Sequence, residues 1–154
     1  MNKRVVKIMS GISGSGKSTY AEDLLNQSQG VKVSADHFFM QNGKYLFDPS
    51  KLGEAHADCF ARFIKFCQDP NGSMIVVDNT SCSSEEIAPY VLGAQAFGWE
   101  PEIITLFCNA DQVLACAKRN QHNVPHGIIE GQHRRLVMRH LPSFWKHRIV
   151  PVKF

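Results

Sequence analysis

Short apolar runs alternate with longer amphipathic stretches along the chain. The runs are rich in β-branched residues and predict strands at 4–9, 31–34, 73–80 and 102–108. Between them, apolar residues recur at helical spacing and predict helices over about 17–27, 49–68, 83–98, 111–119 and 128–140. This alternation predicts an α/β fold in which helices flank a parallel sheet of four to five strands.

Two segments depart from the alternation. Residues 37–49 are aromatic and irregular, with Asn42-Gly43 as their turn. Residues 147–154 predict an additional strand at the edge of the sheet, although Pro151 weakens that prediction because proline cannot donate to a strand ladder. The run that ends at Asp78 is continuously apolar, which is typical of a central strand buried on both faces.

The length and composition predict a single soluble domain over residues 1–154. The chain has 44% hydrophobic and 20% charged residues, which is ordinary for a globular protein. No apolar run approaches the ~20 residues of a membrane helix, so we expect a cytoplasmic protein without a membrane partner. The five cysteines include no Cys-x-x-Cys pair and are expected to be reduced core thiols, with no spacing that supports a zinc site. The oligomeric state is left open.

Charge is distributed unevenly along the chain. Residues 118–154 carry eight Lys or Arg residues against Glu130 alone, whereas residues 1–117 carry nine against thirteen acidic residues. Scattered surface charge is one explanation. A one-sided basic tail also favours an anionic partner, either a polyphosphate or a nucleic acid.

The segment after the first predicted strand matches the phosphate-binding loop G-x-x-x-x-G-K-[ST]. Its glycines let successive backbone N–H groups turn toward phosphate oxygens, and the helix that follows adds its free N–H groups. We therefore expect ATP to bind here, with a lysine on the β- and γ-phosphates and a serine hydroxyl on Mg²⁺. The predicted nucleotide-binding residues are Gly11, Ser13, Gly14, Ser15, Gly16, Lys17, Ser18 and Thr19.

Two carboxylates follow predicted strands, at the sheet edge where ligands of α/β proteins bind. Asp36 is placed to accept a proton from an attacking hydroxyl, although a lone aspartate here also suits a turn. Asp78 ends an apolar strand as a Walker B aspartate does, and is predicted to hold Mg²⁺ or its waters; a loop carboxylate is the alternative. Asn79 and Thr80 reach the same crevice and are candidates for acceptor binding.

A basic helix end, Lys118-Arg119, opens into the polar segment 120–127. An arginine on such a lid is able to close over the transferring phosphoryl group and stabilise its charge. Arg119 is the predicted catalytic arginine because it lies at the hinge of this break. Most of the other basic residues in the tail are expected to be surface charges.

The irregular 37–49 segment contains four aromatic residues and Lys44. Aromatic side chains in a loop stack on nucleobases in many nucleic-acid-binding proteins, but they also form the buried underside of packed loops. Both roles stay open for Phe38, Phe39, Tyr45 and Phe47.

Five motifs in order resemble the polynucleotide 5′-hydroxyl kinase branch of the P-loop kinases. This branch includes the kinase half of phage polynucleotide kinases and the small kinase domains of the NEDD-four-binding-protein-two type. The resemblance covers roughly residues 4–139. The motifs are GISGSGKST (11–19), SADHFF (34–39), GKYLFDP (43–49), VVDNT (76–80) and AKRNQHNVP (117–125).

The resemblance implies an adenylate-kinase-like core with a helical lid, and transfer of the γ-phosphoryl group of ATP, with Mg²⁺, to a 5′-hydroxyl end. It places Lys17 and Ser18 on the phosphates and the metal. It places Asp36 at the family's general base, Asp78 at its second essential aspartate, and Arg119 in the lid that carries its arginines.

The chain departs from the phage pattern at two places on the acceptor side. Phe39 stands where the phage enzymes have an arginine, three residues after the base, that grips the acceptor's own phosphate. His122 and Asn123 occupy the region of a second lid arginine. Acceptor recognition is therefore expected to differ, through Lys44 or the basic tail, and a non-nucleic acceptor stays open.

The sequence as a whole predicts an ATP-dependent kinase acting on 5′-hydroxyl ends of RNA or DNA. The first alternative is a P-loop kinase of a small-molecule hydroxyl, such as a sugar, nucleoside or antibiotic. The second is a nucleotide-binding module without transfer, in which Asp36 and Arg119 have no role.

Overall fold

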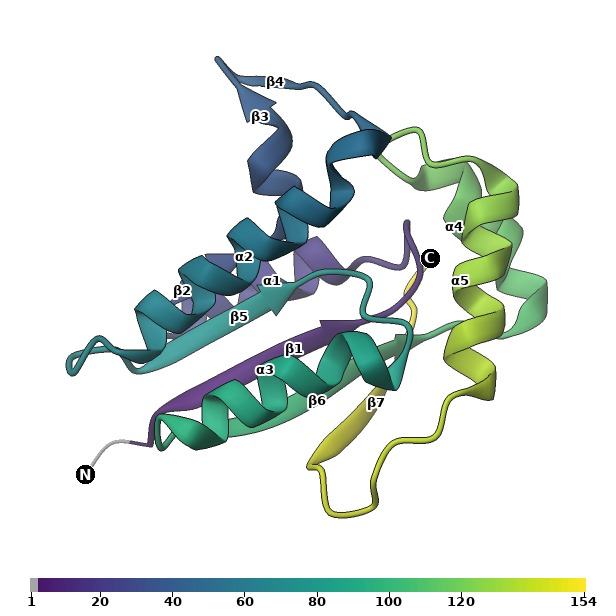
Figure 1. Ribbon diagram of the computed structural model, residues 1–154. Coiled ribbons are helices and arrows are strands. Elements are labelled where there is room, and N and C mark those ends of the chain that lie inside the picture. The colour runs from purple at the N-terminus through teal and green to yellow at the C-terminus, as the bar shows by residue number, and fades with distance from the viewer. Residues whose placement is uncertain (1–2) are drawn as a thin grey trace.

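Five parallel strands form the central sheet of the protein, which the computed structural model describes over residues 3–154 (Figure 1). Their order across the sheet is β2 (Val31–Val33), β5 (Met74–Asp78), β1 (Val5–Ser10), β6 (Glu100–Phe107) and β7 (His147–Pro151). Every neighbouring pair is parallel, so all five carboxyl ends meet at one edge. The predicted α/β fold with a parallel sheet flanked by helices is confirmed.

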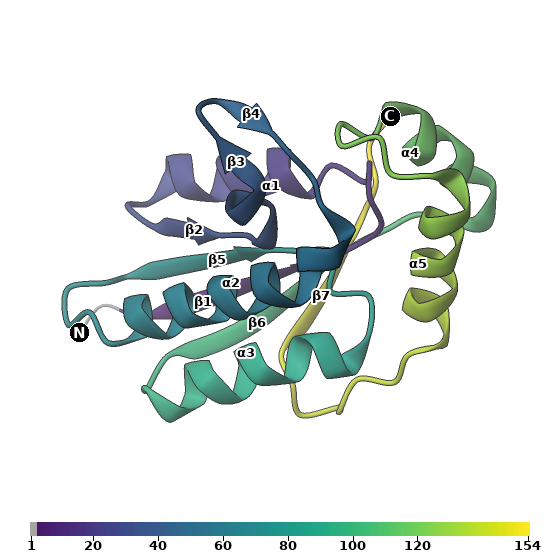
Figure 2. The same cartoon turned by 45° about the horizontal axis from the view of Figure 1, so that its top comes forward.

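Helices cover both faces of the sheet (Figure 2). The predicted helices are confirmed, but the segments predicted to begin at 49 and 111 each open with a short 3₁₀ turn. At the first of these, the Asp48 side chain accepts the Ser50 N–H and Pro49 fixes the first turn. The helices are α1 (Lys17–Gln27), α2 (Leu52–Cys67), α3 (Ser84–Ala96), α4 (Val113–Arg119) and α5 (His126–Met138), and the 3₁₀ turns are η1 (Ala35–Phe39), η2 (Pro49–Lys51) and η3 (Ala110–Gln112).

Two hydrophobic cores lie on opposite faces of the sheet. Successive strand residues point to opposite faces, so Ile103 packs into the core under α2 and α3, and Ile104 into the core under α1, α4 and α5. Because both faces are covered, the central strand β5 is apolar up to Asp78, as its continuous run predicts.

The irregular 37–49 segment contains a feature that the pattern did not predict, a two-stranded ribbon of β3 (Met40–Gln41) and β4 (Lys44–Tyr45). Asn42 and Gly43 form its turn with φ of 51° and 77°. Positive φ at both positions is the geometry of a tight hairpin turn, which Asn-Gly favours. The strands are too short to leave a periodic pattern, and the ribbon projects away from the sheet (Figure 1).

The tail forms the predicted edge strand, β7, which pairs with β6. Pro151 is its last residue, where a missing N–H does not interrupt the ladder. Ion pairs of the Glu102 carboxylate on β6 connect β7 to the rest of the sheet. The carboxylate lies 3.1 Å from Lys146 and 3.3 Å from Arg148, and it also pairs with Lys7 of β1 at 3.1 Å. Within residues 3–154, the helices are all too short or too polar to cross a bilayer.

Candidate active site at the carboxyl edge of the sheet

A cavity of about 440 Å³ lies at the carboxyl edge of the sheet. Its walls come from the phosphate loop and the start of α1, from the ends of β2 and β5, from the segment after α4, and from the tail beyond β7. The cavity thus brings together most of the predicted site residues. Those on its walls are Ser13, Gly14, Ser15, Gly16, Lys17, Ser18, Thr19, Asp36, Asp78, Asn79, Thr80 and Arg119.

The phosphate loop leaves β1 and turns into α1 as predicted. Gly16 has φ 96° and immediately precedes Lys17, the first residue of the helix, so the free N–H groups of the first turn face the cavity side of the loop. Gly14, with φ 82°, lies against α4: a Cβ on it would come within 2.0 Å of the Cys116 carbonyl oxygen. Only glycine fits there, because any side chain would collide with the helix backbone.

Lys17 is buried at the base of the loop. Its Nζ donates to the Ile12 carbonyl at 2.9 Å. Burial lowers the pKa of Lys17, and the nearby Asp78 and Asp36 carboxylates act in the opposite direction. A second anion close to this ammonium, such as a phosphate, would favour its charged form further.

Ser18 and Asp78 meet across the loop. The Ser18 hydroxyl donates to Asp78 Oδ2 at 2.9 Å, and Asp78 is almost fully buried at the end of β5. A hydroxyl and a carboxylate oxygen are the hard ligands that Mg²⁺ prefers, so this pair fits a magnesium ion or its waters.

Asp36 lies on η1, directly after β2, and its carboxylate has two neighbours that sequence reasoning missed. The Tyr45 hydroxyl, from β4, donates to Asp36 Oδ1 at 3.0 Å, and His122 Nε2 lies 3.6 Å from Asp36 Oδ2. The ring centroids of Tyr45 and His122 are 4.3 Å apart. Burial and the Asp36 charge raise the pKa of Tyr45, so its phenol remains a hydrogen-bond donor.

Asn79 and Thr80 connect the loops around the cavity. Asn79 Oδ1 accepts the Ala35 N–H at 2.8 Å, which ties the end of β5 to the turn that carries Asp36. The Thr80 carbonyl accepts the Gly11 N–H at 2.8 Å. Both residues line the cavity while fixing the relative positions of the phosphate loop and Asp36.

Arg119 lies between the phosphate loop and the tail. Its Nε donates to the Gly14 carbonyl, its Nη1 donates to the Lys153 carbonyl at 2.6 Å, and its guanidinium lies 4.5 Å from the Phe154 ring centroid. The predicted catalytic arginine thus borders the cavity, held by carbonyl groups on either side.

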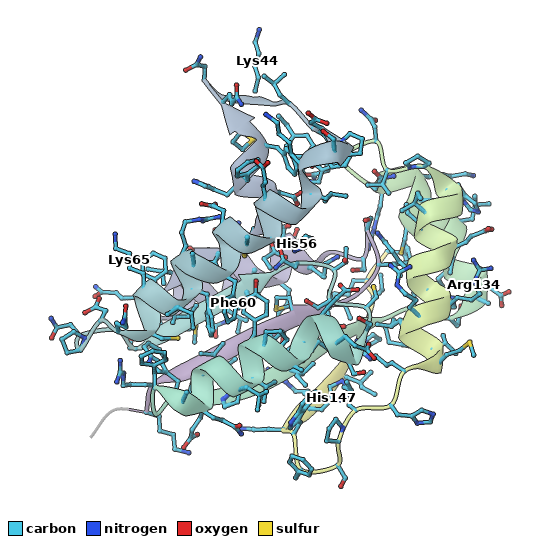
Figure 3. All side chains as sticks on the ribbon, viewed as in Figure 1. Lys44, His56, Phe60, Lys65, Arg134 and His147 are labelled. Carbon is cyan, nitrogen blue, oxygen red and sulfur yellow. The ribbon has the colours of Figure 1, made fainter. Side chains whose placement is uncertain are left out.

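Phe39 and Lys44, two predicted acceptor-binding residues, lie outside this cavity. Phe39 is 3% exposed and packs edge-on against Phe38 and Phe47, beside a second hollow under the ribbon. Lys44 is exposed on the projecting ribbon (Figure 3). The residues of the 37–49 segment and of the lid that do reach Asp36 are Tyr45 and His122.

Comparison with known proteins assigns most of the chain to a family. A family model described as an AAA domain matches residues 6–140. The chain belongs to this AAA domain family. The matched range of this AAA domain includes the phosphate loop, Asp36, Asp78 and Arg119.

Relatives of this AAA domain include proteins of different sizes. NEDD4-binding protein 2 from Homo sapiens is 34% identical over 126 residues, which is 78% of this chain and 7% of that protein. The chain therefore spans a small part of the curated relative that it matches.

Solved structures share the fold of this AAA domain. A gluconokinase from Sinorhizobium meliloti 1021 matches with a TM-score of 0.66 and 16% identity, over 99% of this chain and 85% of that chain. A chain of the Pnkp1/Rnl/Hen1 RNA repair complex matches with a TM-score of 0.70 and 21% identity, over 89% of this chain and 45% of that chain. The AAA domain thus has a P-loop fold that is also found in a kinase.

Proposed function

We propose that this AAA domain is an ATP-dependent kinase that transfers the γ-phosphoryl group of ATP to the 5′-hydroxyl end of a polynucleotide. The observation that carries the proposal is the position of Asp36, whose carboxylate lines the same cavity as the phosphate loop. A kinase needs a base for the acceptor hydroxyl beside the bound triphosphate, whereas a protein that only binds nucleotide does not.

On the donor side, ATP binds with its phosphates in the loop. Backbone N–H groups of the loop and of the first turn of α1 surround the phosphate oxygens. Lys17 exchanges its hydrogen bond with the Ile12 carbonyl for the β- and γ-phosphate oxygens. Ser18 and Asp78 are the residues that would hold Mg²⁺, which when bound would neutralise charge on those oxygens.

On the acceptor side, Asp36 takes the proton of the 5′-hydroxyl as its oxygen attacks the γ-phosphorus. The bond from the γ-phosphorus to the β–γ bridging oxygen breaks, and ADP leaves. The hydroxyl needs one of the two Asp36 oxygens. His122, at 3.6 Å, makes the longer contact and lies in the segment between α4 and α5, so its displacement frees Oδ2.

Two features support a polynucleotide acceptor. The five ordered motifs resemble the polynucleotide kinase branch, and the Tyr45 and His122 rings beside Asp36 offer flat surfaces on which a terminal base is able to stack. A small-molecule hydroxyl is the second candidate, because the gluconokinase shares the fold.

The test is a transfer assay with γ-labelled ATP. The protein is incubated with 5′-hydroxyl RNA, with 5′-hydroxyl DNA, with the same oligonucleotides carrying a 5′-phosphate, and with a panel of sugars and nucleosides. Label on the 5′-hydroxyl oligonucleotides alone supports the proposal. Label only on a small molecule supports the second candidate, and ATP binding without any transfer refutes both.

A further inference from the structure

Arg139, the residue that follows α5, inserts its guanidinium beneath the phosphate loop. Its Nη1 donates to Ser10 Oγ at 2.6 Å and to the Ser81 carbonyl at 3.0 Å, and its Nη2 donates to Thr105 Oγ1 at 2.7 Å. Ser10 and Thr105 are themselves buried on β1 and β6. One side chain therefore joins three segments of the carboxyl edge.

Arg139 is half-buried, and no carboxylate lies within ion-pair distance of its guanidinium in residues 3–154. Burial lowers the pKa of Arg139, and the nearby Cys82 and Glu86 act in the opposite direction. The planar fork of the guanidinium donates to three neutral oxygens instead, which compensates for part of the cost of removing its charge from water.

Two of the three residues that Arg139 contacts, Ser10 and Ser81, lie next to the two loops of the site. Ser10 is the last residue of β1, directly before Gly11, and its hydroxyl donates to the Ser81 carbonyl at 2.8 Å. Ser81 has φ 43°, a left-handed conformation that is strained for a serine, and it follows the Asp78–Thr80 segment. The guanidinium thus fixes the phosphate loop against the loop that carries Asp78.

Gln132, on α5 itself, makes a second connection to the phosphate loop. It is 7% exposed, and its Oε1 accepts the Ser13 N–H at 2.9 Å. Gln132 lies on the buried face of α5 with the apolar Ile129 and Leu136, and Arg139 follows directly after the end of the helix. The helix and the residue that follows it thus both contact the loop region.

We propose that Gln132 and Arg139 are positioning residues that hold the phosphate loop in the geometry that accepts a triphosphate. Gln132 orients the Ser13 N–H, and Arg139 fixes the position of Ser10, where the phosphate loop begins, relative to Asp78. This inference rests on the proposed function only in taking ATP as the bound nucleotide. ATP binding requires no acceptor, so it tests the inference separately from the polynucleotide assignment.

The test compares ATP and adenosine binding in the full chain and its variants. Arg139→Met and Gln132→Met are each expected to weaken ATP binding about tenfold, which is the usual effect of losing one charge-assisted or buried hydrogen-bonded group. Adenosine binding, followed by NMR titration, should change less than about twofold, because adenosine has no phosphate for the loop to hold. Arg134→Met is the matched control, since Arg134 lies on the same helix and points away from the sheet (Figure 3).

Two further variants separate geometry from charge and from folding. Arg139→Lys retains the charge but not the fork, so it should still bind ATP more weakly than the unmodified protein does. In the Arg139→Met background, Ser10→Ala should weaken ATP binding by a smaller factor than it does in the unmodified protein, because the contact with Arg139 is already lost and only the Ser10 contact with the Ser81 carbonyl remains to be removed. If Arg139→Met does not fold, the near-isosteric Gln132→Met carries the test.

Three results would overturn the proposal. In the first, Gln132→Met and a folded Arg139→Met bind ATP as the unmodified protein does. In the second, ATP and adenosine binding fall by the same factor, as a loss of folded protein would cause. In the third, Arg139→Lys is indistinguishable from the unmodified protein, which would show that the charge alone suffices. An unmodified protein that binds ATP but transfers nothing would refute the kinase proposal and leave this one standing.

Discussion

The carboxylate of Asp36 is positioned by groups from three segments that are far apart in the chain. The Asn79 side chain holds the Ala35 N–H, the Tyr45 hydroxyl occupies one oxygen, and His122 approaches the other. A carboxylate that is half exposed would otherwise rotate freely, and a general base acts efficiently only when its oxygen is aimed at the proton it removes.

Replacing Asp36 with Asn should abolish most transfer while leaving the nucleotide site intact. The amide cannot accept the hydroxyl proton, so kcat should fall at least about 100-fold, and the Kd for ATP should stay within about threefold. Labelled-ATP kinetics and calorimetry measure the two quantities. Asp111→Asn, an exposed carboxylate on η3, is the control. A fully active Asp36→Asn protein would remove the proposed base.

Sequence reasoning placed Asp36 and Asp78 at one cavity because the carboxyl ends of parallel strands meet at one edge. It named Tyr45 and His122 as candidates for other roles but did not predict that they contact Asp36. Tyr45 reaches Asp36 because of a two-residue strand pairing, and His122 lies in an irregular segment between two helices. Neither position has a periodic pattern, so their contacts depend on the three-dimensional path of the chain.

At the scale of elements, the phosphate loop depends on the two helices that follow β6. Helix α4 presents the Cys116 carbonyl directly against Gly14, and α5 supplies the Gln132 and Arg139 contacts. The sequence did predict both helices. The sequence also contained an indication of the Gln132 contact that was not used, since Gln132 falls on the apolar stripe of α5, where a polar residue needs a buried partner.

Gly14→Ala should disrupt both stability and nucleotide binding. The added Cβ would overlap the Cys116 carbonyl oxygen at a residue whose φ is 82°, so we expect a loss of about 2–5 kcal/mol in unfolding free energy from the clash and the backbone strain together.

The matched change is Gly53→Ala, because Gly53 lies in α2 and a Cβ added there would have no neighbour within 4 Å. The unfolding free energy of that variant should rise by about 0.5–1 kcal/mol, since alanine favours a helix. Urea unfolding of the two proteins measures both values. A Gly14→Ala protein as stable as the unmodified one would mean that α4 is able to move away from the loop.

At the scale of the whole molecule, the order β2-β5-β1-β6-β7 places the phosphate loop at the centre of the sheet. Alternating strands and helices predicted parallel pairing but not this order, because hydrophobic periodicity shows which face of a strand is buried and not which strand lies beside it. Edge position was predictable for β7 alone, from its short polar pattern and Pro151.

Mild acid should weaken the link between the edge strand and the arginine beneath the loop. Thr105 Oγ1, which accepts from Arg139, lies 2.7 Å from His147 Nε2, and burial and the Arg139 charge lower the pKa of His147. The unfolded chain therefore binds this proton more readily. Stability from the neutral ring is fully present above the unfolded value of 6.5 and is lost as the pH falls below it.

Urea unfolding at pH 7.5 and at pH 5.5 should show the effect. His147→Gln retains an acceptor for Thr105 but does not titrate, so it should lose less stability between the two pH values than the unmodified protein. His140→Gln, which changes an exposed histidine near α5, should behave like the unmodified protein. Equal losses in all three proteins would exclude His147 as the group responsible.

Salt should affect transfer less than the basic tail suggests. Of the eight Lys and Arg residues in 118–154, four are engaged within the protein: Arg119, Arg139, Lys146 and Arg148. With at most four cations left for a single strand, log(kcat/KM) against log[KCl] should have a slope no steeper than about −3. A slope of about −5 or steeper would mean that the internal contacts open to bind the acceptor.

The contact of Arg119 with the Lys153 carbonyl and the Phe154 ring has a practical consequence for fusion proteins. A polypeptide joined after Phe154 would emerge at the rim of the cavity, beside the guanidinium. One joined ahead of Lys3 would leave from the opposite edge of the sheet (Figure 1). Affinity tags, fluorescent reporters or neighbouring domains on the first side would restrict entry to the cavity, and those on the second would leave it open.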